Sequence, residues 1–155
     1  MKNTSKLKTV SLFLSVCLLI VASFFVFGGI KASETNKAVI DVRLNNPKSA
    51  ALHLKLIHQS FKERDTVVMF SGPSVKLISK DREGFSAEEN KLLDEISSAI
   101  SEMSKDGIKL EVCLVAARVF GVDQASILED IKHVENGWLS IVDYQANGYY
   151  LVPAY

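Results

Sequence analysis

Cysteine is scarce in this chain of 155 residues. Only Cys17 and Cys113 occur, and Cys17 lies inside an apolar N-terminal stretch that is removed if the stretch is a cleaved signal. A single cysteine in the remaining domain has no internal disulfide partner, so packing must stabilise the fold. The thiol of Cys113 is therefore buried and inert, paired between chains, or reactive.

Several functional motifs are also missing. Gly72 stands alone, so there is no glycine-rich phosphate loop, and no Gly-x-Ser-x-Gly elbow marks a hydrolase nucleophile. His53 and His58 lie five residues apart on one predicted helix, roughly 140° apart around its axis, and cannot share a metal ion. We therefore predict no metal site and no cofactor. Cys113 with His133 is the only conceivable metal nucleus.

The N-terminus is basic and then strongly apolar. Lysines precede an uncharged run over residues 10–30, and the first acidic residue is Glu34. This order is typical of an export signal, with cleavage expected after Ala32. The run also approaches the roughly 20 residues that span a bilayer, so an uncleaved anchor in the inner membrane stays open. We expect residues 1–32 to direct the domain to the periplasm or elsewhere outside the cytoplasm, and to make its only membrane contact.

The charge balance argues against one class of partner. The chain has 18 basic and 18 acidic residues, and removal of residues 1–32 takes away four lysines and no acid, which leaves 14 basic against 18 acidic groups and a net charge of −4. A mildly acidic domain without a basic cluster does not attract nucleic acid. The remaining length suits one domain with its own core.

Hydrophobic periodicity predicts alternating strands and helices. Asn46 followed by Pro47 indicates a helix start, and Ser86 with Glu89 forms a capping box. The alternation favours right-handed crossovers, with helices on both faces of the sheet. We expect an α/β fold over residues 37–155, a three-layer sandwich with a mainly parallel five-stranded sheet. The predicted strands are 37–44, 66–70, 109–113, 131–134 and 149–152, and the longer helices are 47–63, 86–106 and 138–145.

Cys113 is the strongest candidate for a functional residue. It ends the strand 109–113 and precedes a helix-like stretch, where unpaired backbone N–H groups favour the thiolate. Parallel sheets bind ligands outside the carboxyl ends of their strands, and Ser71 and Gly72 follow the preceding strand. A thiolate there can attack a sulfane sulfur and hold it as a persulfide, with Arg118 as support. The alternative is a packed core cysteine, which is the common state of this residue.

The C-terminal part of the chain is rich in aromatic residues. It contains Trp138, Tyr149, Tyr150 and Tyr155. We expect most of them in the core, although tyrosine is also favoured where subunits meet. An oligomer built on this end of the chain is the further expectation.

Three segments read together resemble the DsrE/DsrF-like family. They are the run Cys-Leu-Val-Ala-Ala-Arg-Val-Phe-Gly-Val from Cys113, the step Val134-x-x-Gly137, and Gln145-x-x-Gly148-Tyr149. The likeness covers the chain from about residue 37 onward. It implies a small α/β domain that forms homo-oligomers, commonly trimers or hexamers. In sulfur-carrier members, DsrE and TusD, it also implies a cysteine that accepts a persulfide and passes it on, a position that Cys113 matches.

Two hypotheses of function follow from these observations. The first is an exported, sulfurtransferase-like carrier that binds or relays sulfane sulfur as a persulfide on Cys113, with a sulfur donor or acceptor as partner. The well-understood carriers work in the cytoplasm, whereas the N-terminus of this chain predicts export. The second is a non-catalytic oligomeric module of the cell envelope that binds a small ligand or assembles with other proteins, with Cys113 as a structural residue.

Overall fold

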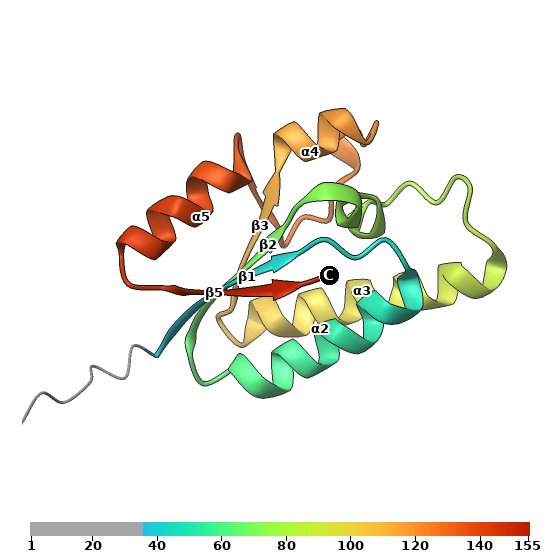
Figure 1. The fold of residues 1–155 in the computed structure, drawn as a ribbon. Helices are drawn as coiled ribbons and strands as arrows, with labels where there is room; N and C mark the ends of the chain where they lie inside the picture. The colour runs from blue at the N-terminus through green and yellow to red at the C-terminus, as the bar shows by residue number, and fades with distance from the viewer. Residues whose placement is uncertain (1–35) are drawn as a thin grey trace, which may run out of the picture. The chain divides into compact units, whose positions relative to one another are not determined.

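A five-stranded parallel sheet forms the centre of the fold (Figure 1). The computed structural model describes residues 36–155. The strand order is β4-β3-β2-β1-β5, and every neighbouring pair is parallel. The predicted mainly parallel sheet is therefore confirmed, and it is parallel throughout. The strands are β1 (Lys37–Val42), β2 (Asp65–Phe70), β3 (Lys109–Cys113), β4 (Lys132–Val134) and β5 (Tyr150–Ala154).

Helices cover both faces of this sheet, as the three-layer prediction requires. In Figure 1, α2 (Pro47–Phe61) and α3 (Ala87–Lys105) lie side by side below the sheet, and the two helices contact each other. On the opposite face, α5 (Gly137–Ala146) contacts four of the strands. Three shorter pieces complete the fold: α4 (Leu114–Val119) and the 3₁₀ helices η1 (Gly72–Ile78) and η2 (Gln124–Ser126).

Side-chain caps set the helix starts. The Asn46 side chain accepts the N–H of Ser49 at 3.0 Å before α2, and the predicted capping box of Ser86 and Glu89 opens α3. These caps satisfy N–H groups that have no partner inside the helix. The helix α4 begins directly after β3, earlier than the stretch expected from residue 116, because Cys113 itself acts as its cap.

The core lies on both sides of the sheet. β1 and β2 are buried after their first residue, since helices cover both of their faces. The largest fully buried side chains include Phe70, Ile40 and Leu54. Two carboxylates interrupt this apolar interior, Asp41 in β1 and Glu111 in β3. Buried carboxylates need partners, which both oxygens of Asp41 and Oε1 of Glu111 have, whereas Oε2 of Glu111 has none.

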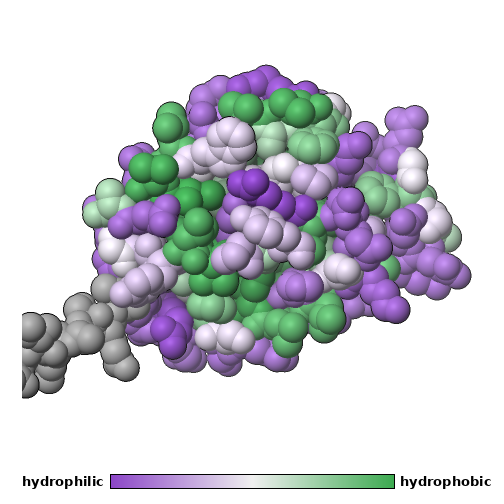
Figure 2. All heavy atoms as spheres, in the orientation of Figure 1, coloured by the Kyte–Doolittle hydropathy of each residue, from purple (hydrophilic) through white to green (hydrophobic). Residues whose placement is uncertain are grey.

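The expectation that the C-terminal aromatics are mostly core residues is wrong. Tyr149 is buried, whereas Trp138, Tyr150 and Tyr155 are 65%, 64% and 70% exposed. β5 is an edge strand that pairs only with β1, and Trp138 lies on the first turn of α5. Hydrophobic residues also reach the surface on the side of the molecule that carries α4 and α5 (Figure 2). This side therefore presents apolar and aromatic groups to its surroundings.

The predicted export signal or anchor over residues 1–32 lies outside the described residues. Within residues 36–155, no helix is both long enough and apolar enough to cross a bilayer.

Glu111 connects β3 to α5. Its Oε1 accepts the hydroxyl of Tyr144 and the ammonium of Lys132, each at 3.0 Å. Burial, and after it the hydrogen bond to this carboxylate, raises the pKa of Tyr144 to about 12. The neutral phenol thus helps to hold α5 against the sheet.

We expect the free energy of unfolding to fall as the pH rises from about 10 towards 12. In this range the unfolded chain releases a tyrosine proton, since the ordinary pKa is about 10, whereas folded Tyr144 keeps its proton. The contribution of the Tyr144 phenol to the free energy of unfolding is complete below pH 10 and is lost as the pH rises above 10. Tyr149, whose pKa is also raised by burial, adds a slope of the same sign. Urea unfolding of the native chain and of Tyr144→Phe between pH 8 and 11.5 measures the difference.

Tyr150→Phe is the matched control, because Tyr150 is exposed on the edge strand. Its pH slope should match that of the native chain, whereas the slope of Tyr144→Phe should be shallower. Equal slopes in all three proteins would contradict the assignment to Tyr144.

Candidate functional site

Cys113 ends β3 and caps α4. Its Sγ accepts two backbone hydrogen bonds, from the N–H of Ala116 at 3.4 Å and from the N–H of Gly137, the first residue of α5, at 3.2 Å. The residue is only 6% exposed. N–H groups from two separate segments therefore point at one sulfur, and such donors stabilise negative charge on it.

The two segments that donate to the sulfur are also joined to each other. The N–H of Val115 donates to the carbonyl oxygen of Glu135 at 3.2 Å. The Asn136 side chain accepts the N–H groups of Trp138 and Leu139 at the start of α5. The side chain of Asn136 caps α5 through the N–H groups of Trp138 and Leu139 and does not bind the N–H of Gly137. That N–H donates to the sulfur of Cys113 instead.

Gly137 packs directly on Cys113. A Cβ atom at position 137 would lie 2.8 Å from the Cβ of Cys113 and 3.1 Å from the Sδ of Met69. Carbon atoms do not approach to 2.8 Å without a shift of the backbone. A glycine is therefore required for α5 to begin this close to β3.

Cys113 lines a pocket of about 250 Å³ at the carboxyl edge of the sheet. Ser71 and Gly72, which follow β2, line the same pocket. The structure thus brings together three of the four residues predicted for the site. Gly72 has a φ of 55°, a conformation that favours glycine. The remaining lining residues come from three segments and are mostly apolar: Arg43, Val115, Ala116, Val119, Phe120, Asn136 and Trp138.

Arg118, the fourth predicted residue, does not line this pocket. Its Nη2 donates to Oε1 of Glu135 at 2.5 Å on an exposed surface. Glu135 is also the main cause that raises the pKa of Arg118, and the influence of Cys113 is the smallest. The hydrogen bond of this guanidinium goes to Glu135, so its support of the thiolate stays a prediction.

Sequence reasoning missed two residues, Asp41 and Arg43. Asp41 is 2% exposed, and its Oδ1 accepts the hydroxyl of Ser71 at 2.5 Å. Its Oδ2 accepts Nε of Arg43 at 2.9 Å and lies 2.8 Å from Nη2 of the same residue. The available signal was an aspartate in an otherwise apolar strand, close to the carboxyl end where parallel sheets place their sites.

The guanidinium of Arg43 also lies against two aromatic rings. It is 5.9 Å from the centre of the Trp138 ring and 5.6 Å from the centre of the Tyr155 ring. Both distances are within the range of cation–π attraction. An ion pair and two rings thus hold a cation at the wall of the pocket that contains the sulfur.

Cys113 and His133 do not form a metal nucleus. His133 pairs in register with Val112, whereas Cys113 pairs with Val134. Adjacent residues of a strand point to opposite faces of a sheet, so the thiol and the imidazole lie on different faces. Residues 36–155 also contain no group of three or more His, Cys, Asp or Glu side chains placed to hold a metal ion.

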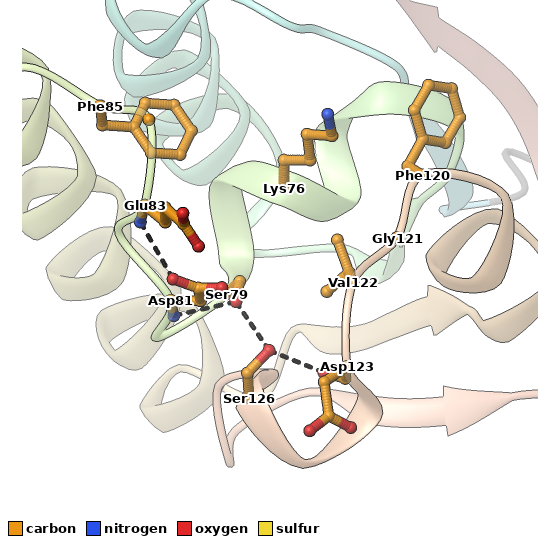
Figure 3. A pocket seen from close by; sticks show the side chains of 11 residues that line it. Lys76, Ser79, Asp81, Glu83, Phe85, Phe120, Gly121, Val122, Asp123 and Ser126 are labelled. Carbon is orange, nitrogen blue, oxygen red and sulfur yellow. Dashed lines mark hydrogen bonds between the residues drawn. The ribbon is translucent and has the colours of Figure 1, made fainter.

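Figure 3 shows a second pocket, of about 240 Å³. Phe120 lines both pockets, and the charged loop around Asp81 and Glu83 borders the second one only. Its polar groups bond to one another: the hydroxyls of Ser79 and Ser126 are 2.7 Å apart, and the N–H of Asp81 donates to Oγ of Ser79 at 3.0 Å. These contacts join the start of the loop to η2, and no residue of the loop lines the Cys113 pocket.

The fold and the site together define a class of protein. It is a small parallel α/β domain that presents one cysteine, between two N–H donors, at the carboxyl edge of its sheet. The chain belongs to the DsrE/DsrF-like family, whose family model matches residues 37–153. This family is associated with sulfur relay in general. The resemblance read from the sequence is thus confirmed. A comparison with curated proteins gives no match.

Solved structures that are similar to this chain include two proteins of unknown function. One is the protein of unknown function MTH1491 from Methanobacterium thermoautotrophicum, with a TM-score of 0.60, 18% identity, and coverage of 76% of this chain and 97% of that chain. The other is the protein of unknown function BT1422 from Bacteroides thetaiotaomicron, with a TM-score of 0.56, 20% identity, and coverage of 79% and 97%. At these identities the likeness shows the fold.

We expect Gly137→Ala to destabilise the domain by about 1–3 kcal/mol, the usual cost of forcing an extra carbon into a packed site. Alanine in a helix is favoured over glycine by about 1 kcal/mol, so a net loss of stability identifies the clash with Cys113 and Met69. Urea unfolding measures the change. Ser140→Ala on the same helix is the control, and a Gly137→Ala variant as stable as this control would refute the close packing.

Proposed function

We propose that Cys113 carries sulfane sulfur as a persulfide. The proposal rests on one observation above all: the N–H groups of Ala116 and Gly137 donate to its Sγ at the wall of a pocket. Such donors stabilise the thiolate that attacks a sulfane sulfur. The association of the family with sulfur relay supports the same reading.

The surroundings of the sulfur suit a small donor. The pocket of about 250 Å³ has mostly apolar walls, and the low exposure of Cys113 means that reagents reach the thiol through this pocket. An apolar wall limits the access of water to a bound persulfide. The site therefore combines a stabilised sulfur with a restricted entrance, which suits a carrier that must hold its sulfur between two partners.

A homo-oligomer is part of the proposal. Trp138, Leu139 and Val142 are exposed near the start of α5, and large exposed apolar groups of this kind are typical of protein–protein interfaces. Burial of this surface against a second copy would bring a neighbouring chain close to the entrance of the pocket, because Trp138 belongs to both. A homo-oligomer is equally compatible with the alternative function, in which the protein is a binding or assembly module and Cys113 is a structural residue.

Export is the part of the proposal that rests on residues 1–32 alone. A carrier with this N-terminus would exchange sulfur with donors and acceptors outside the cytoplasm.

We expect the folded chain to gain the mass of one sulfur atom when it is incubated with polysulfide. Attack by the Cys113 thiolate breaks an S–S bond of the polysulfide and forms a new one on Cys113, and thiol reductant should reverse the gain. Intact-mass spectrometry measures the addition. Peptide mapping then assigns the added sulfur to Cys113 or to Cys17.

Cys113→Ser is the matched control, and it should show no gain at position 113. A native Cys113 that stays unmodified in the folded protein, while Cys113→Ser folds with the same stability, would refute the carrier. An unmodified native Cys113 together with a Cys113→Ser variant of lower stability would favour the structural role of Cys113.

We expect the native chain to sediment as a multiple of its monomer mass. Leu139→Asp combined with Val142→Asp places two carboxylates on the exposed face of α5 and should shift the protein towards monomer. Gln59→Asp combined with Ser60→Asp adds the same charge to an exposed part of α2 and serves as control. A native chain that sediments as a monomer at micromolar concentration would refute the oligomer.

A further inference from the structure

We propose that Arg43 makes the Cys113 pocket selective for small anionic ligands, so that the sulfur donor is a persulfide whose organic part carries a carboxylate or a similar anionic group. The donor class rests on the proposed carrier function. Recognition of the anion by Arg43 is tested separately below.

The first argument is the charge of the pocket. Arg43 is the only residue with a permanent charge among the ten that line it, and its neighbours on the wall are mostly apolar. A ligand that enters this pocket must lose part of its hydration. An anionic group recovers that loss by hydrogen bonds to a guanidinium, whereas a cationic group finds no compensating partner on this wall.

The second argument is the orientation of the guanidinium. Oδ2 of Asp41 accepts a hydrogen bond from Nε and lies 2.8 Å from Nη2, and these two nitrogens belong to one edge of the planar group. Nη1 takes no part in this pair, so a second edge is left for a ligand. A guanidinium donates two parallel hydrogen bonds along one edge, a geometry that matches a carboxylate.

The third argument is that the cation is fixed before a ligand arrives. The hydroxyl of Ser71 donates to Asp41, the carboxylate that holds the guanidinium of Arg43. The rings of Trp138 and Tyr155 lie against this guanidinium. The aliphatic part of the Arg43 side chain lies within van der Waals distance of the position that a Cβ on Gly72 would occupy. An ordered donor loses little conformational entropy on binding. This order accounts for the presence of Ser71 and Gly72 beside the thiol.

The pair of Asp41 and Arg43 is neutral overall, so the selectivity acts by direct contact and not by long-range attraction. In the transfer step, the Cys113 thiolate attacks the outer sulfur of R–S–SH. The S–S bond of the donor breaks, a new S–S bond forms on Cys113, and R–S⁻ leaves with the electron pair of the broken bond. The proton stays on the transferred sulfur, and no further oxidant is needed. The anionic group of R stays on Arg43 while R–S⁻ forms.

Trp138 gives a direct test of recognition, because it is the only tryptophan in the chain, lines the pocket and lies against Arg43. We expect its fluorescence in the full chain with Cys113→Ala to change saturably with 3-mercaptopropionate. About tenfold more 2-mercaptoethanol should be needed, as expected for the loss of a charge-assisted hydrogen bond. Adding Arg43→Gln should abolish this difference, and Arg43→Lys should retain part of it.

Arg64→Gln is the matched control, since Arg64 is exposed and precedes β2, whereas the pocket lies at the opposite, carboxyl end of that strand. Its preference should equal that of the parent protein. Equal affinity for both probes in the Cys113→Ala chain, or a preference that survives Arg43→Gln in a folded protein, would overturn the inference. Arg43→Gln removes the cationic partner of the buried Asp41 and can destabilise the fold for that reason alone. The double variant Asp41→Asn with Arg43→Gln removes both charges, so it tests recognition without an unpaired buried charge.

Loading of the native chain then separates the inference from the carrier function. The persulfides of 3-mercaptopropionate and 2-mercaptoethanol differ in one group, and we expect the first to load Cys113 about tenfold faster. Equal loading rates would overturn the anionic donor while the carrier stands. No loading from either persulfide would overturn the carrier, and with it the donor class, while the fluorescence titration still decides whether Arg43 recognises the anion.

Discussion

The close contact of Gly137 with Cys113 is the constraint on which the site depends. Because no side chain separates α5 from the end of β3, the first amide of α5 reaches the sulfur, and the amide of Ala116 reaches it from α4. One atom thus joins a strand and two helices. The same contact places Trp138, the next residue, at the entrance of the pocket.

A buried carboxylate organises the other wall of the pocket. Asp41 binds Ser71 after β2 and Arg43 after β1, so two neighbouring strand ends share one anion. Burying a carboxylate is costly unless its oxygens are paired, and here both are. The arrangement fixes a positive charge beside an apolar surface that could not hold one by itself. Different contacts therefore position the sulfur and the cation. Backbone N–H groups of α4 and α5 donate to Cys113, whereas the carboxylate of Asp41 binds Arg43.

Much of the fold followed from local patterns. The caps at Asn46 and Ser86, together with helical spacing, predicted α2 and α3, and the rule for carboxyl ends of parallel strands placed Ser71, Gly72 and Cys113 at one edge. The contact of Asp41 with Ser71 depends on the parallel register of β1 and β2, and the contact of Gly137 with Cys113 depends on where α5 crosses the sheet. Neither can be derived from sequence spacing, because both join segments far apart in the chain.

The use of sulfur as a helix cap has a thermodynamic consequence. An oxygen cap has a fixed chemical state, whereas the acceptor that holds α4 and α5 is an atom whose chemical state can change. Any modification of Cys113 that accepts these two hydrogen bonds better or worse than the unmodified sulfur must change the folding equilibrium by the same free energy, because the two equilibria are linked. The chemical state of a single sulfur and the melting temperature of the whole domain are therefore coupled quantities.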